Sequence, residues 1–103
     1  MKLTLERWDT AKKGKFESSK LLQQLRDEGY SCSTYTFPAG CSFGDHSHAQ
    51  DKKDAILAGE FLFRMDGEEV ILKAGDTLEV PKGHTHYAEV VGGQPCVFVD
   101  ASR

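Results

Sequence analysis

The sequence lacks any long hydrophobic run, and this absence argues against a membrane-spanning helix, which needs about 20 apolar residues in succession. Its first residues, MKLTLERWDTAKK, are polar and charged where an export signal would need an unbroken apolar stretch. Positive charge is not in excess either, because the formal net charge is -3 and the lysines alternate with acidic residues, as in DKKD. We therefore expect a cytoplasmic protein that binds neither a membrane nor a nucleic acid.

Cysteine is scarce and irregularly placed. The three cysteines, Cys32, Cys41 and Cys96, are odd in number and share no spacing, so the sequence predicts neither a disulfide framework nor a zinc knuckle. A chain of 103 residues is large enough for one domain with one hydrophobic core. We expect a single domain, with a strand and a helix in residues 1–29 and a β-barrel in residues 30–103.

The N-terminal part of the chain predicts one strand and one helix. Residues 2–8, KLTLERW, alternate leucine with polar residues, which is typical of a strand with one buried face and suits the edge of a sheet. Residues 17–30, ESSKLLQQLRDEGY, carry leucines at helical spacing, a serine suited to the N-cap, and Gly29 as a stop signal. We expect this helix to be the only one.

From Tyr30 onward the sequence consists of short β-prone runs separated by turn residues. One of them is DAILAGEFLFRM, residues 54–65, and the Asp66-Gly67 pair that follows predicts a tight hairpin. Strands this short and this regularly spaced are typical of a small sandwich or barrel rather than an α/β sheet. The predicted fold class is all-β.

All four histidines fall in two H-x-H pairs, His46/His48 and His84/His86, each expected at the start of a strand. Residues i and i+2 of a strand point to the same face, so two such strands inside a barrel can bring their imidazoles to one metal ion. Imidazole suits iron, nickel, copper and zinc. The alternative is that one or both pairs lie on the surface or form structural hydrogen bonds.

The residues around these pairs resemble the two sequence motifs of the cupin superfamily, over roughly residues 36 to 99. The first motif corresponds to Gly40, five residues, His46, Ser47, His48 and then Gly59; the second corresponds to Gly75, five residues, Pro81, Lys82, Gly83, two residues and His86.

The resemblance implies a double-stranded β-helix, or jelly-roll barrel, with a divalent metal ion held inside by His46, His48 and His86. Iron, manganese, nickel, zinc and copper are all compatible with these ligands. It also implies a small-molecule ligand or substrate, and a homodimer that pairs through sheet edges, with residues 2–8 as a candidate for the exchanged strand.

The sequence departs from the family at the position of its usual glutamate, four residues after the second histidine, where Lys52 stands. An ammonium group repels a cation and cannot ligate it while it keeps its proton. Asp54 has the same facing as Lys52 in a strand and is our first candidate for a substitute ligand, unless DKKD is a solvated turn. His84 is a further candidate, as a fourth ligand, a proton shuttle or an exposed side chain. Val90 replaces the asparagine that the second motif often has.

Two classes of function remain open. A metal-dependent enzyme of dioxygenase, isomerase or lyase type would need the three histidines to converge with an open coordination position. A non-catalytic domain that binds or senses a small ligand, with or without metal, is favoured by Lys52. A purely structural role would leave both H-x-H pairs unexplained, and the fold alone does not select the reaction.

Overall fold

The computed structural model describes residues 3–103 as two antiparallel sheets with two helices between the first and second strands. The helices are α1 (Thr10–Lys13) and α2 (Ser18–Asp27). The strands are β1 (Leu5–Glu6), β2 (Ser31–Phe37), β3 (Ser42–His46), β4 (Lys52–Ala58), β5 (Glu60–Met65), β6 (Glu68–Leu72), β7 (Thr77–Val80), β8 (His86–Val91) and β9 (Cys96–Ser102).

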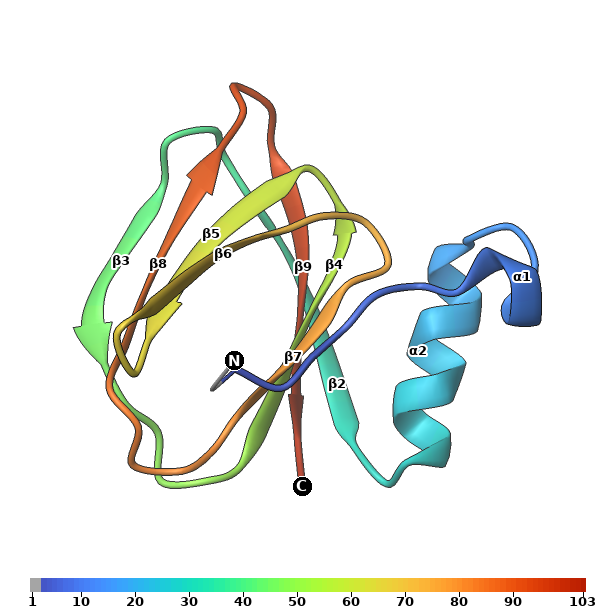
Figure 1. The fold of residues 1–103 in the computed structure, drawn as a ribbon, viewed down its shortest axis with the longest axis horizontal. Coiled ribbons are helices and arrows are strands. Elements are labelled where there is room, and N and C mark those ends of the chain that lie inside the picture. Colours follow the sequence, from blue (N-terminus) through green and yellow to red (C-terminus); the bar gives the residue numbers. More distant parts are fainter. Residues whose placement is uncertain (1–2) are drawn as a thin grey trace.

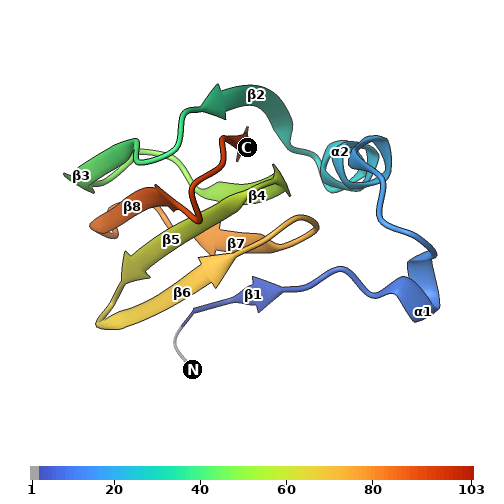
Figure 2. The same cartoon turned by 90° about the horizontal axis from the view of Figure 1, so that it is seen from above.

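The sheets form the two walls of a barrel. One sheet has the strand order β1-β7-β4-β9-β2 and the other β3-β8-β5-β6, so neighbours in space come from distant parts of the chain. Figures 1 and 2 show β4, β7 and β9 on one side of the interior and β3, β5 and β8 on the other. The expected all-β jelly-roll barrel is confirmed.

The interior of the barrel is filled because apolar side chains alternate along its strands. Phe61, Phe63 and Met65 of β5 are buried, whereas the residues between them are partly or fully exposed. In β8, the buried Ala88 and Val90 alternate with partly exposed residues in the same way. These side chains form the main hydrophobic core.

A second core lies on the outer face of the five-stranded sheet, where α2 packs. Leu21 and Leu25 are 1% and 0% exposed and contact Ala55 of β4 and Val99 of β9. Burying each leucine stabilises the fold by about 1.5–3 kcal/mol. Figure 1 shows α2 outside the barrel, beside β2. Because β4 is covered on both faces, Asp54, Ala55 and Ile56 are all buried.

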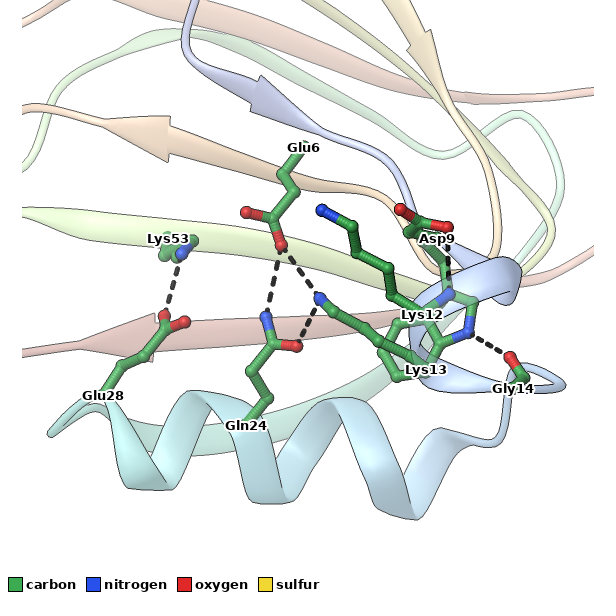
Figure 3. A network of polar contacts seen from close by, with 9 residues as sticks. Glu6, Asp9, Lys12, Lys13, Gly14, Gln24, Glu28 and Lys53 are labelled. Carbon is green, nitrogen blue, oxygen red and sulfur yellow. Dashed lines mark hydrogen bonds and ion pairs between the residues drawn. The ribbon is translucent and has the colours of Figure 1, made fainter.

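Polar contacts fasten the N-terminal segment to α2 and α2 to the sheet, as Figure 3 shows. The ammonium group of Lys13 donates a hydrogen bond to Gln24 at 2.8 Å and forms an ion pair with Glu6 at 3.3 Å. Lys53 of β4 pairs with Glu28, just after α2, at 2.9 Å.

The expectation of a single helix with a serine N-cap was wrong in two details. A second helix, α1, forms because the side chain of Asp9 accepts hydrogen bonds from the backbone N–H groups of Ala11 and Lys12, which caps its first turn. The N-cap of α2 is Glu17 rather than a serine, and its side chain forms no capping hydrogen bond.

The N-terminal strand is shorter than predicted, although it lies at a sheet edge as expected, where β1 pairs with β7. The pairing ends after Glu6, and Arg7 then forms an ion pair with the buried carboxylate of Asp76. Trp8 packs edge-on against Phe16. Residue 2 of the predicted strand lies outside the described residues.

Neither helix in residues 3–103 is long and apolar enough to cross a bilayer.

The run DAILAGEFLFRM is divided at Gly59 into two strands of different sheets, β4 and β5. Gly59 has a φ of +84°, and a Cβ there would lie 2.5 Å from the carbonyl oxygen of Pro95 and 2.9 Å from the Cα of Cys96. Only glycine fits this corner without strain.

The predicted hairpin is confirmed: Asp66 and Gly67, with φ of 54° and 78°, connect β5 to β6.

We predict that Gly59→Ala destabilises the protein more than Gly40→Ala. Both glycines have positive φ, +84° and +80°, but a Cβ at Gly40 has no heavy atom within 4 Å. Gly40→Ala should therefore cost about 1–2 kcal/mol from backbone strain alone, and Gly59→Ala about 3 kcal/mol or more because of the added clash with backbone atoms. Urea unfolding of both variants measures the difference, and equal losses would contradict the close approach of Pro95.

Candidate metal centre

Three of the four histidines meet inside the barrel. His46 of β3 and His86 of β8 are direct cross-strand partners, and their ring centroids are 4.2 Å apart. The ring of His48, from the loop after β3, lies 5.0 Å from that of His46 and 5.1 Å from that of His86. Within residues 3–103, these three histidines form a cluster whose ligand atoms all lie within 4.8 Å of one another.

The expectation that both H-x-H pairs begin strands was wrong for the first pair. His46 is the last residue of β3, and His48 lies beyond its end. The β3–β8 register, with an irregularity between Phe43 and His46, sets His46 against His86. Convergence therefore depends on strand pairing rather than on i, i+2 spacing along one strand.

Backbone carbonyl groups orient two of the imidazole rings. The Nδ1 atom of His46 lies 2.7 Å from the carbonyl oxygen of Gly44, and Nδ1 of His86 lies 3.0 Å from that of His84. A carbonyl oxygen can only accept, so each Nδ1 carries the hydrogen and donates it. Each Nε2 atom then keeps its lone pair, which is the tautomer that metal-binding histidines adopt when Nδ1 donates to the protein.

The surroundings of His48 and His86 favour the neutral form of these two imidazoles. Burial, followed by the neighbouring His46 and the ammonium group of Lys52, lowers the pKa of His48, against the opposing effect of Asp100. Burial is also the largest cause that lowers the pKa of His86, which is 4% exposed. Neutral imidazole is the form that binds a metal ion.

The histidines lie at one side of a cavity of about 170 Å³. Asp54 of β4 and Asp100 of β9 come from the opposite sheet. Most of the remaining lining is aromatic, namely Tyr35, Phe37, Phe43, Phe61, Phe63 and Phe98. The cavity thus combines nitrogen donors, two carboxyl groups and a predominantly aromatic wall.

Lys52, at the position of the family's usual glutamate, is paired with a carboxylate. Its ammonium group lies 3.1 Å from each carboxylate oxygen of Asp100, and the two side chains are 15% and 32% exposed. The positive charge of Lys52 is therefore balanced within the protein. Sequence reasoning missed Asp100, because only the pairing of β4 with β9 brings it to Lys52.

Asp54 lies two residues after Lys52 in β4 and therefore on the same face of the strand, as strand parity predicts. Its side chain lines the cavity, and the residue is 8% exposed. The alternative that DKKD is a solvated turn was wrong for residues 52–54, which belong to β4. Burial, and then the facing Asp100, raise the pKa of Asp54 to about 8, although Lys52 acts in the opposite direction. Asp54 is outside the three-histidine cluster, and its role as a ligand stays a prediction.

His84 lies away from the cluster, although it precedes His86 by two residues. Its side chain is 44% exposed, and Nδ1 is 3.0 Å from a carboxylate oxygen of Asp66 in the β5–β6 turn. Of the roles considered for His84, the structure agrees best with an exposed side chain, and its function as a ligand or proton shuttle stays a prediction.

Comparison with known proteins identifies relatives of this architecture. The family described as "Cupin domain" matches residues 33–102. An oxalate-binding protein of Thermotoga maritima is 30% identical over 90 residues, which cover 84% of this chain and 74% of that protein. An acireductone dioxygenase of Geobacillus thermodenitrificans is 34% identical over 67 residues, which cover 55% of this chain and 37% of the enzyme. The chain therefore spans little more than a third of that enzyme.

Solved structures give the same result. A cupin protein from Bacteroides fragilis matches with a TM-score of 0.61 and 28% identity, covering 71% of this chain and 64% of that one. An RmlC-like cupin from Shewanella frigidimarina matches with a TM-score of 0.64 and 25% identity, over 71% of this chain and 64% of its own.

The raised pKa of Asp54 predicts how stability depends on pH. From pH 4 to pH 8 the folded protein keeps a proton that the unfolded chain has lost, so its stability falls as pH rises through this range and then levels off. Asp54→Asn removes this term. The stability of the metal-free variant relative to wild type should therefore increase by about 1.4 kcal/mol per pH unit between about pH 5 and pH 7.

Urea unfolding at several pH values measures this difference. Asp27→Asn, which neutralises an exposed carboxylate at the end of α2, is the matched control and should keep the wild-type pH profile. Parallel profiles for Asp54→Asn and wild type would show that Asp54 is ionised in the folded protein.

Proposed function

We propose that this chain, which belongs to the cupin domain family, binds a divalent metal ion through His46, His48 and His86 and holds a small organic molecule in the adjoining cavity. The observation that carries the proposal is the orientation of the rings: His46 and His86 donate Nδ1–H to backbone carbonyl groups, which leaves Nε2 of each available. The ligand atoms of all three side chains lie within 4.8 Å of one another, a spacing that one ion with bonds of about 2.1 Å to nitrogen can bridge after small adjustments.

The donor set fits several ions. Three neutral imidazoles suit iron, nickel, copper and zinc, and manganese is a further candidate. Because Lys52 stands where the family has glutamate and is paired with Asp100, no carboxylate of the cluster offsets the charge of the ion. Such an ion supplies Lewis-acid or oxygen-binding chemistry and attracts an anionic ligand.

The relatives support two functions for this site. The acireductone dioxygenases favour a metal-dependent enzyme of dioxygenase type, although isomerase or lyase chemistry on a small organic substrate fits the same donors. The oxalate-binding protein, which aligns over most of this chain, favours the alternative of a non-catalytic domain that binds a small carboxylate. Lys52 in place of the glutamate is the observation that favours the second function.

Assembly and location are proposed from the resemblance alone. We propose a cytoplasmic homodimer joined through sheet edges, with no nucleic-acid or membrane partner. Within one chain β1 already pairs with β7, so an exchanged strand in the dimer would replace this pairing with the same one between subunits.

The metal site is tested by metal content. Protein purified without an affinity tag should contain close to one divalent metal ion per chain by mass spectrometry, whereas His46→Ala/His48→Ala should contain almost none, because only one of three donors remains. His84→Ala is the matched control and should keep the wild-type content, since His84 bonds to Asp66 outside the cluster. Absence of metal in wild type after incubation with iron, manganese, nickel and zinc would refute the site.

Catalysis and binding are separated on the metal-loaded protein. Small organic acids, oxalate among them, are titrated by calorimetry, and the same mixtures are followed for oxygen consumption and for new products by mass spectrometry. An enzyme should convert one of these acids at a rate that His46→Ala/His48→Ala abolishes. Saturable heat of binding with no product would instead support the binding protein.

A further inference from the structure

The cavity has a second polar wall, opposite the histidines, that the metal site does not use. Asp54 of β4 and Asp100 of β9 are direct cross-strand partners, and both line the cavity. Two ionised carboxylates in this position repel each other. The arrangement is stable only if one of them is paired with a cation or keeps its proton.

The two carboxyl groups divide these roles between them. The ammonium group of Lys52 lies 3.1 Å from both oxygens of Asp100, so this cation is paired with Asp100. Asp54 is 8% exposed, and no hydrogen bond from residues 3–103 is found at its carboxyl group. Its partner on the other side, in β7, is the apolar Leu78. Asp54 is therefore the member of the pair that keeps a proton.

A protonated carboxyl group that is buried without a partner can still donate a hydrogen bond, and here it lines the cavity. Burial of such a group without a hydrogen bond is costly. An oxygen atom of a bound molecule would remove this cost, most effectively if that oxygen carried negative charge. A carboxylate ligand meets this requirement.

The charges of the whole site favour the same ligand. Imidazole ligands bring no negative charge to a metal ion, and the carboxylate of Asp100 is paired with Lys52, so a divalent ion bound there would have no compensating anion among the three histidines. This step rests on the proposed metal site. A negative charge on the ligand would partly offset the charge of the ion in a cavity whose wall is mostly aromatic.

The aromatic lining of the cavity indicates that the rest of the ligand is apolar. Phe37, Phe61 and Phe98 pack together at centroid distances of 5.0 and 5.6 Å and line the same cavity. Apolar atoms placed against these rings leave water, whereas a second charged group there would lose its hydration without a partner. The cavity of about 170 Å³ resembles in size an engineered apolar cavity of about 150 Å³ that holds benzene.

We propose that the cavity takes a small monocarboxylate with an apolar or aromatic body, and that Asp54 is a binding residue that donates a hydrogen bond from its protonated carboxyl group to an oxygen of that ligand. His46, His48 and His86 would hold a metal ion that could bind the carboxylate, and the aromatic rings would contact the apolar body. Asp54 thus selects the ligand without ligating the metal.

The test uses benzoate as the probe on metal-loaded protein at pH 6.5, with the dissociation constant measured by calorimetry. Asp54→Asn keeps a donor of the same shape, so its dissociation constant should stay within about threefold of wild type. Asp54→Val keeps the shape without the donor and should bind at least about tenfold more weakly, since a hydrogen bond to a charged group is lost. Acetate, which lacks the apolar body, should bind wild type at least about tenfold more weakly than benzoate.

Asp27→Val, on the exposed end of α2, is the matched control and should bind benzoate as wild type does. Metal content is measured on every sample. Loss of metal in Asp54→Asn would show that Asp54 is a ligand and overturn the proposal. Wild-type affinity in Asp54→Val, an equal loss in Asp54→Asn, or no binding of benzoate to metal-loaded wild type would overturn it too.

These outcomes are distinct from a failure of the proposed function. A wild-type protein that takes up no metal refutes the metal site itself, and with it the ligand that depends on the ion. Should Asp54→Val fail to fold, Asp54→Asn still decides, because its metal content and its affinity for benzoate test both parts of the proposal. Equal affinities for benzoate and acetate would refute the apolar body of the ligand.

Discussion

The antiparallel pairing of β4 with β9 is the constraint on which the rest of the molecule depends, because both faces of this pair are in use. On the outer face, Ala55 and Val99 are register partners and support the leucines of α2. On the inner face, the same register sets Asp54 against Asp100 and brings Lys52 within hydrogen-bond distance of Asp100. A shift of one residue would exchange the two faces and bury the charged side chains under the helix.

The Lys52–Asp100 pair explains how a lysine is accommodated beside a histidine cluster. An unpaired ammonium group would repel a metal ion and destabilise the cavity. Asp100 comes from near the end of the chain and pairs with this ammonium group, so no unpaired positive charge lies beside the three imidazoles. The negative charge at this place therefore comes from Asp100 of the neighbouring strand β9, whereas the first motif of the family usually has a glutamate at the position of Lys52 itself.

The relatives agree on the architecture and disagree on the activity. An oxalate-binding protein and a dioxygenase are each similar in sequence to part of this chain. Since the same fold serves binding and catalysis, the distinction depends on the few side chains that face the ligand. In this chain the cavity is lined by the three histidines, the carboxyl groups of β4 and β9 and aromatic rings.

The sequence by itself determined the all-β class, the Asp66-Gly67 hairpin, the edge position of the first strand and the three histidines, because each depends on local spacing or on a motif. Strand parity also placed Asp54 on the inner face. It did not identify the capping of α1 by Asp9, which depends on a single side chain in an otherwise polar segment.

Only the tertiary structure decided through which strand registers distant side chains meet. His46 faces His86 through the β3–β8 register, and Asp100 faces Asp54 through the β4–β9 register. Residues far apart in sequence leave no mark of their pairing in a local pattern, because register is selected by burial over whole strands and both sheets at once.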